Sequence, residues 1–130
     1  ISQKIQAACH QAKRSEKDVQ LIAVSKLQSI EVIKDAYSLG INHFGENYAQ
    51  ELDKKVFATP KDIIWHFIGP IQSNKVKLIA RHADWIHSLE REKIAKNSGE
   101  WSNQVKLAAT ISWKEAYKSS QVSTLDQFMV

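Results

Sequence analysis

The sequence predicts an α/β fold in which helices and strands alternate along a parallel sheet. Short apolar runs recur along the chain, amphipathic segments with helical spacing separate them, and glycine or proline often stands where an element should end. Apolar runs that alternate with helical patterns are typical of βα units, whose right-handed crossovers make neighbouring strands parallel.

The first elements follow from periodicity. Apolar residues at helical spacing predict an N-terminal helix that ends near Arg14 or Ser15. These residues are Ile1, Ile5, Ala8, Cys9 and Ala12. The apolar run 21–25 then predicts a strand covered on both faces, as strands of parallel sheets are.

The next helix has a clear beginning and end. Ser29 can accept a hydrogen bond from a free amide of the first turn, and Gly40 is typical of the glycine that follows a helix. A strand is expected at 41–44. Apolar residues at helical spacing mark the helix after it: Tyr48, Leu52 and Val56.

Three more strands are expected, at 63–68, 83–87 and 105–111, and Pro60 marks the loop before them. Helices are expected at about 72–80 and 90–96, and a last one at 125–129. About five strands result. They fit a small doubly wound sheet or the first part of an eight-stranded barrel, and the pattern alone leaves both open.

Composition favours one domain over 1–130, because 130 residues suffice for a single core. The formal charge of +4 comes from lysines and arginines interleaved with acidic residues, so we expect no nucleic-acid partner. No apolar stretch approaches the roughly 20 residues that span a bilayer, and no signal-peptide pattern opens the chain. The single cysteine, Cys9, suits a reducing compartment, so the cytoplasm is the expected location.

Lys26 directly follows the first predicted strand. The carboxyl ends of parallel strands line the functional crevice or barrel mouth. An amine held there can lose part of its hydration, which favours the neutral form that attacks an aldehyde in a Schiff base. The alternative is a solvated lysine without a function.

Polar residues also follow the second and third strands. Asn47, after Gly45, offers both a donor and an acceptor, or simply caps the next helix. His66 interrupts an apolar strand, so its ring faces the interior or supports a neighbour. Gln72, Asn74 and Lys75 open a helix and form either a weak anion site or an ordinary cap.

Other chemistries are not indicated. His82 and His87 lack the spacing of zinc ligands. The sequence contains no nucleophile elbow, P-loop or dinucleotide fingerprint. The four tryptophans read as packing residues and not as a platform for stacked bases.

Together, three segments resemble the pyridoxal phosphate homeostasis protein family. They are LIAVSK at 21–26, FGENY at 44–48 followed by Gln50-Glu51, and WHFIGPIQSNK at 65–75. The resemblance runs from about Arg14 to Ser88 and fades towards Lys118. It implies an incomplete (β/α)8 TIM-type barrel, like the barrel domain of alanine racemase.

The resemblance also implies a cofactor and a function. Lys26 matches the lysine that holds pyridoxal 5′-phosphate as a Schiff base, and Asn47 matches an asparagine near the cofactor. The expected pocket wall is His66, Gly69, Gln72 and Asn74. Such proteins are regarded as carriers or buffers of the cofactor, without catalytic turnover, in vitamin B6 and amino-acid homeostasis in the cytoplasm.

The chain departs from the family pattern after the lysine, where Leu27-Gln28-Ser29 replaces the usual Thr-Lys-Pro and removes a second lysine. In a later motif, Lys118-Ser119-Ser120 lacks the usual glycine, and Lys118 is the nearest counterpart of that motif's lysine. The sequence also stops near the fifth strand, before the loops that commonly hold phosphate in barrels.

Three explanations of this length stay open. The chain is a fragment, or a partner or swapped copy completes it through an open sheet edge, or cofactor binding is lost. Two rival functions stay open as well. One is a racemase-like enzyme that uses Tyr48 and His66 as acid and base. The other is an interaction module that self-associates through the sheet edge.

Overall fold

The computed structural model describes residues 1–89 and the backbone of residues 106–109. The helices predicted at 90–96 and 125–129, and the motif around Lys118, lie outside the described residues. Within the described ranges, no helix is both long and apolar enough to span a membrane.

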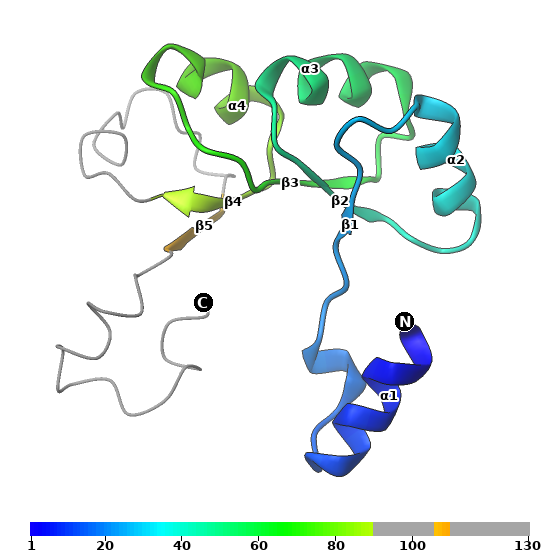
Figure 1. Ribbon diagram of the computed structural model, residues 1–130. Coiled ribbons are helices and arrows are strands. Elements are labelled where there is room, and N and C mark those ends of the chain that lie inside the picture. Colours follow the sequence, from blue (N-terminus) through cyan, green and yellow to red (C-terminus); the bar gives the residue numbers. More distant parts are fainter. Residues whose placement is uncertain (90–105, 110–130) are drawn as a thin grey trace, which may run out of the picture.

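The strands form one five-stranded sheet in the order β1-β2-β3-β4-β5, and each neighbouring pair is parallel. The strands are β1 (Ala23–Val24), β2 (His43–Glu46), β3 (Ile64–Phe67), β4 (Trp85–Leu89) and β5 (Lys106–Ala109). A doubly wound sheet reverses its strand order at a switch point, whereas barrel strands follow one another in sequence. The observed order therefore decides for the barrel-type topology (Figure 1).

Three helices cover one face of the sheet (Figure 1). They are α2 (Ile30–Ser38), α3 (Ala49–Ala58) and α4 (Val76–His82). The core lies between them and the sheet, where Phe44, Leu52, Phe67, Ile79 and Ile86 are almost fully buried. This is the helix-covered face that βα units produce.

Helix α2 has both of its predicted ends. The Ser29 hydroxyl accepts a hydrogen bond from the Val32 amide at 3.3 Å. Gly40 has a φ of +98°, and the amides of Gly40 and Ile41 donate to the carbonyls of Tyr37 and Ala36. These are the bonds of a Schellman motif, whose left-handed position glycine occupies without steric cost.

Two predicted helix boundaries are wrong. Helix α1 (Ser2–Gln11) ends earlier than expected, because Lys13 has a φ of +53° and leaves the helical path. The helix predicted at about 72–80 begins later than expected, because α4 starts at Val76 after a 3₁₀ turn, η2 (Ser73–Lys75).

The expectation that strand 21–25 is covered on both faces is also wrong. Strand β1 is short and lies at the edge of the sheet. Ser25 is buried on the helix side, but Val24 on the opposite face is 52% exposed. The inner face of β1 is thus open among the residues that the structure describes.

Candidate functional site

Side-chain alternation along the strands divides the site into two faces. On β2, Phe44 and Glu46 point towards the helices, since Phe44 belongs to the core and Glu46 contacts Lys55 on α3. His43 and Gly45 therefore lie on the inner face. The same alternation places His66 of β3 on that inner face, between the core residues Trp65 and Phe67.

Sheet register gives Lys26 and Asn47 equivalent positions after two neighbouring strands. Val24 pairs with Gly45, and the Ser25 amide continues the ladder with a 3.0 Å hydrogen bond to the Gly45 carbonyl. Lys26 and Asn47 each follow this pair by two residues, just beyond the ends of β1 and β2. The predicted first and second polar turns are neighbours at the carboxyl ends of β1 and β2.

Lys26 is nevertheless exposed. The predicted partial loss of hydration is therefore not found in the described structure. The reason is the open inner face of β1, where no described layer covers the side chain beyond Val24. The strand end gives Lys26 its position but does not exclude water from it.

Asn47 carries an unused hydrogen-bonding atom. Its side chain is partly buried, and its Oδ1 is inaccessible to solvent without a hydrogen-bond partner among the described residues. Buried polar atoms are nearly always satisfied, so an orphan acceptor needs an explanation. A ligand donor at this position would satisfy it.

Gly69 joins the second and third polar turns through the backbone. A Cβ built on Gly69 would lie 2.1 Å from the Asn47 carbonyl oxygen, so only glycine fits this approach. On the other side, the Ser88 hydroxyl donates a short hydrogen bond to the Gly69 carbonyl. Gly69 thus lets the two backbones approach closely and has no side chain to offer as a pocket wall.

A cavity of about 120 Å³ lies beside Asn47. It is lined by Asn47, Tyr48, Ala49, Gln50, Phe67, Pro70, Gln72, Lys75 and Ile79. Gln72 lines this cavity, whereas Lys26 and His66 do not. Asn74 is exposed in η2 and does not line this cavity.

His66 is buried in a row of three histidine rings. Its Nε2 lies 2.9 Å from Nδ1 of His43, and its Nδ1 lies 2.8 Å from Nε2 of His87. Burial, with smaller contributions from His87 and His43, lowers the pKa of His66 to about 4. Burial also lowers the pKa of His87 and, against the opposing effect of Asp84, that of His43. The row is uncharged at neutral pH.

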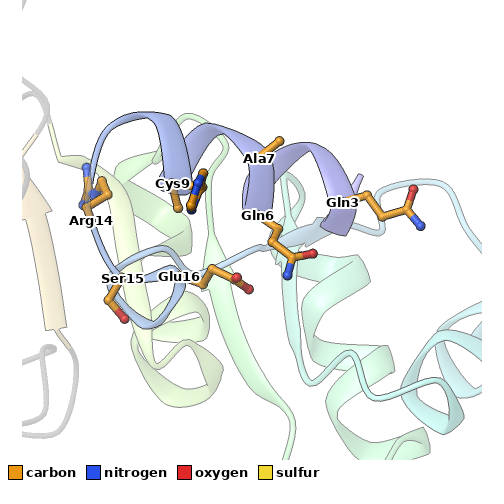
Figure 2. Close-up of a pocket in the computed structure, with 8 residues that line it drawn as sticks. Gln3, Gln6, Ala7, Cys9, Arg14, Ser15 and Glu16 are labelled. Atoms are coloured by element: carbon orange, nitrogen blue, oxygen red, sulfur yellow. The ribbon is translucent and has the colours of Figure 1, made fainter.

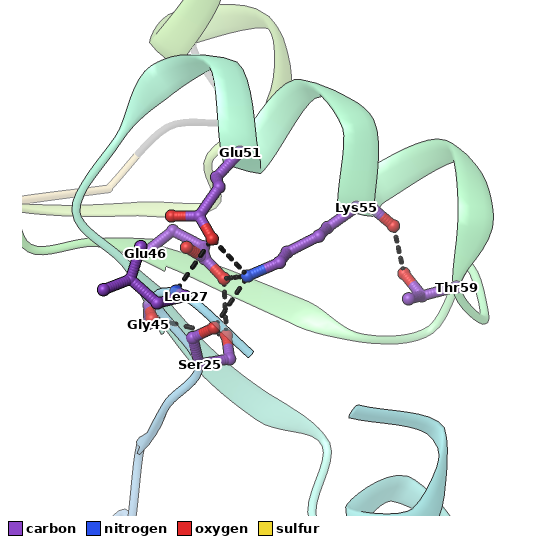
Figure 3. Close-up of polar contacts among 7 residues, drawn as sticks. All are labelled: Ser25, Leu27, Gly45, Glu46, Glu51, Lys55 and Thr59. Atoms are coloured by element: carbon purple, nitrogen blue, oxygen red, sulfur yellow. Dashed lines mark hydrogen bonds and ion pairs between the residues drawn. The ribbon is translucent and has the colours of Figure 1, made fainter. Parts of the chain in front are cut away.

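Sequence reasoning missed a buried ionic network behind the Lys26 turn (Figure 3). Lys55 on α3 is only 5% exposed, and its Nζ lies 2.6 Å from Glu46 Oε1 and 3.0 Å from Glu51 Oε1. It also donates to the Ser25 carbonyl at 2.7 Å. The available signals were an acidic residue in an apolar strand and the i,i+4 spacing of Glu51 and Lys55.

No described group of three or more histidine, cysteine or acidic residues is arranged to hold a metal ion.

A larger cavity of about 570 Å³ lies away from this site, against α1 and the turn after it (Figure 2). Its lining includes Gln3, Cys9, Arg14 and Glu16, but no residue of a strand end.

Comparison with known proteins finds relatives that carry the same name. The chain is 52% identical over 103 residues to the pyridoxal phosphate homeostasis protein of Pasteurella multocida, covering 77% of this chain and 44% of that protein. It is 41% identical over 99 residues to that of Escherichia coli K12, covering 73% and 42%. No protein-family profile matches the sequence.

Solved structures agree. PipY of Synechococcus elongatus PCC7942 without PLP superposes with a TM-score of 0.65 at 33% identity, covering 84% of this chain and 54% of PipY. PipY with PLP bound gives 0.59 at 38% identity, over 71% and 44%.

The sequential parallel sheet and its superposition on PipY define a TIM-barrel-like α/β protein over part of the barrel. Within that class, the chain belongs to the pyridoxal phosphate homeostasis protein family. It spans less than half the length of the curated relatives that it matches.

Proposed function

We propose that this chain contributes to a pyridoxal 5′-phosphate-binding protein that holds the cofactor as a Schiff base on Lys26, without catalytic turnover. Its role would be vitamin B6 and amino-acid homeostasis in the cytoplasm. The observation that carries this proposal is the register of β1 and β2, since Lys26 and Asn47, with its unsatisfied Oδ1, follow these paired strands at equivalent positions.

The chemistry needs one amine and one carbonyl. When bound, the cofactor would supply an aldehyde, and the Lys26 amine would form a Schiff base with it, with release of one water molecule. Lys26 needs access to the mouth, and its exposed position after β1 gives it that access.

The residues present fit such a ligand. The Asn47 amide offers a donor and an acceptor, so it can bond a phenolic group in either protonation state. Gly69 allows a close approach of its backbone to that of Asn47, and Gln72 lines the cavity beside Asn47. We propose that residues beyond the described half of the barrel hold the phosphate group, as late barrel loops commonly do.

Binding without turnover is favoured by the state of His66. A racemase needs an acid and a base that exchange protons with the substrate. Both ring nitrogens of His66 are already engaged, by His43 and His87. Incubation of the loaded protein with single-enantiomer amino acids should leave their optical purity unchanged, and racemisation would contradict this part of the proposal.

Cofactor titration tests the proposal directly. Adding pyridoxal phosphate to the full protein should produce a visible absorbance band that is lost in Lys26→Ala. The band should be kept in Lys34→Ala, a control that changes an exposed lysine on α2. Asn47→Ala should weaken binding about tenfold, as expected for one lost hydrogen bond to a polar group. An unchanged band in Lys26→Ala would reject the proposal.

Self-association through the edge strand β1 stays a prediction. Edge strands present unpaired amides and carbonyls that can pair with another chain. Sedimentation velocity with and without the cofactor would test it, and a monomer that binds the cofactor would argue against a pure interaction module.

A further inference from the structure

We propose that Glu51 and Lys55 are positioning residues for Lys26, acting on the backbone on both sides of it. This inference rests on the proposed function, because it assigns these residues a part in presenting the Schiff-base lysine. Neither residue is placed to touch the cofactor. Both belong to α3, whereas Lys26 follows β1.

The contacts bracket Lys26. On its N-terminal side, the Ser25 carbonyl accepts a hydrogen bond from Lys55 Nζ at 2.7 Å. On its C-terminal side, the Leu27 amide donates to Glu51 Oε1 at 2.8 Å. A 3.0 Å ion pair between Lys55 and Glu51 joins the two contacts (Figure 3). The lysine is therefore the one residue between two anchored neighbours.

The turn needs such anchors. Leu27 has a φ of +61°, in the left-handed region that is unfavourable for residues with a Cβ. Its side chain is 78% exposed, so packing does not hold it there. Two described hydrogen bonds hold this conformation: the Leu27 amide donates to Glu51, and the Gln28 amide closes the turn by donating to the Ser25 carbonyl at 3.1 Å. Loss of the Glu51 contact would leave only the turn bond to hold the backbone after Lys26.

Burial makes the network rigid. Glu46 is fully buried, and its Oε1 accepts from both Lys55 Nζ and, at 2.7 Å, the Ser25 hydroxyl. Charged hydrogen bonds are stronger when shielded from water, and a lost partner leaves a buried charge unpaired. Ser25 is thereby held through its carbonyl and its hydroxyl, in addition to the bond of its amide to Gly45, directly before Lys26.

The decisive comparison is Glu51→Ala against Glu51→Gln, which keeps a side-chain acceptor for the Leu27 amide. Three quantities are measured in the full protein: hydrogen exchange of the Leu27 amide without cofactor, the Kd for pyridoxal phosphate, and the urea midpoint. Glu31→Ala, on the exposed first turn of α2, is the control. Lys55→Met removes the second anchor and keeps the length of the side chain.

For Glu51→Ala we expect about tenfold faster exchange of the Leu27 amide and about tenfold weaker cofactor binding, the effect of one charged hydrogen bond. Glu51→Gln should restore both to within about threefold of the natural protein. Lys55→Met should weaken binding at least as much, and Glu31→Ala should change neither quantity.

Outcomes separate the two proposals. If the natural protein binds no pyridoxal phosphate, the proposed function fails, and Leu27 exchange alone still decides whether Glu51 fixes this backbone. Unchanged exchange in Glu51→Ala overturns the inference. Faster exchange in Glu51→Ala with an unchanged Kd for pyridoxal phosphate also overturns the inference, because Glu51 would then stabilise the backbone without affecting cofactor binding. A lower urea midpoint in Glu51→Gln with normal exchange and Kd supports it, since stability and positioning would be separable.

Discussion

The ring of His66 lies 2.9 Å from the ring of His43, measured from Nε2 to Nδ1, across the boundary between β3 and β2. A second contact joins His66 to His87 on β4. Three neighbouring strands of the sheet thus present histidines to one another on the inner face. Protonation of any one of the three rings would place a positive charge in direct contact with a neighbouring ring.

Stability should therefore fall on acidification. The pKa of His66 drops from 6.5 in a free chain to about 4 in the folded protein. Between pH 6.5 and about pH 4, His66 is protonated in the unfolded chain but neutral in the folded protein. The free energy of unfolding therefore decreases as the pH falls through this range. The loss attributable to His66 should be roughly 1–3 kcal/mol.

Urea unfolding at pH 7.5 and pH 4.5 measures this effect. His66→Gln should lose less stability between the two pH values than the natural protein does. His10→Gln, at an exposed position on α1, should behave like the natural protein. Equal losses in His66→Gln and the natural protein would show that the histidine row does not govern the acid response.

Gly69→Ala should be strongly destabilising. The added methyl group would meet the Asn47 carbonyl oxygen at 2.1 Å, and backbone cannot move aside as a side-chain tip can. We expect the free energy of unfolding to drop by about 2–3 kcal/mol. Gly45→Ala, whose nearest contact is the Ile68 Cδ1 methyl at 3.2 Å, should cost less than about 1 kcal/mol. Similar costs for the two would contradict the close approach.

Leu27→Gly should stabilise the fold. Glycine tolerates the φ of +61° that leucine adopts there, and the exposed leucine side chain contributes little burial. Thermal unfolding should show a gain of about 0.5–1 kcal/mol. Leu39→Gly is the matched control, an exposed leucine with an ordinary φ of −88°, and should bring no gain. A loss of stability in Leu27→Gly would argue against strain in this turn.

Local signals in the sequence predicted the local structure well. Ser29 and Gly40 were identified as the ends of a helix because capping depends on residues close in sequence. The alternation of strands and helices predicted the parallel sheet in the same way. Strand order, which separated the barrel from the doubly wound alternative, became known only from pairing in space.

Contacts between distant segments could not be predicted from the sequence. Glu51 and Lys55 have the spacing of a solvated helix pair, but Lys55 is buried because it contacts Glu46 on β2 and Ser25 after β1. The fit of Gly69 against Asn47 likewise depends on how two loops meet. Conversely, the position of Lys26 was predicted, but its exposure was not, because water access depends on what covers the strand.

The most direct measurement is borohydride reduction of the full protein with pyridoxal phosphate, followed by intact mass and peptide mapping. Reduction fixes the C=N bond as a stable amine and so marks the lysine that formed it. The account predicts a single adduct on the peptide that contains Lys26, and none in Lys26→Ala. An adduct on Lys75 or another lysine, with Lys26 unmodified, would contradict it.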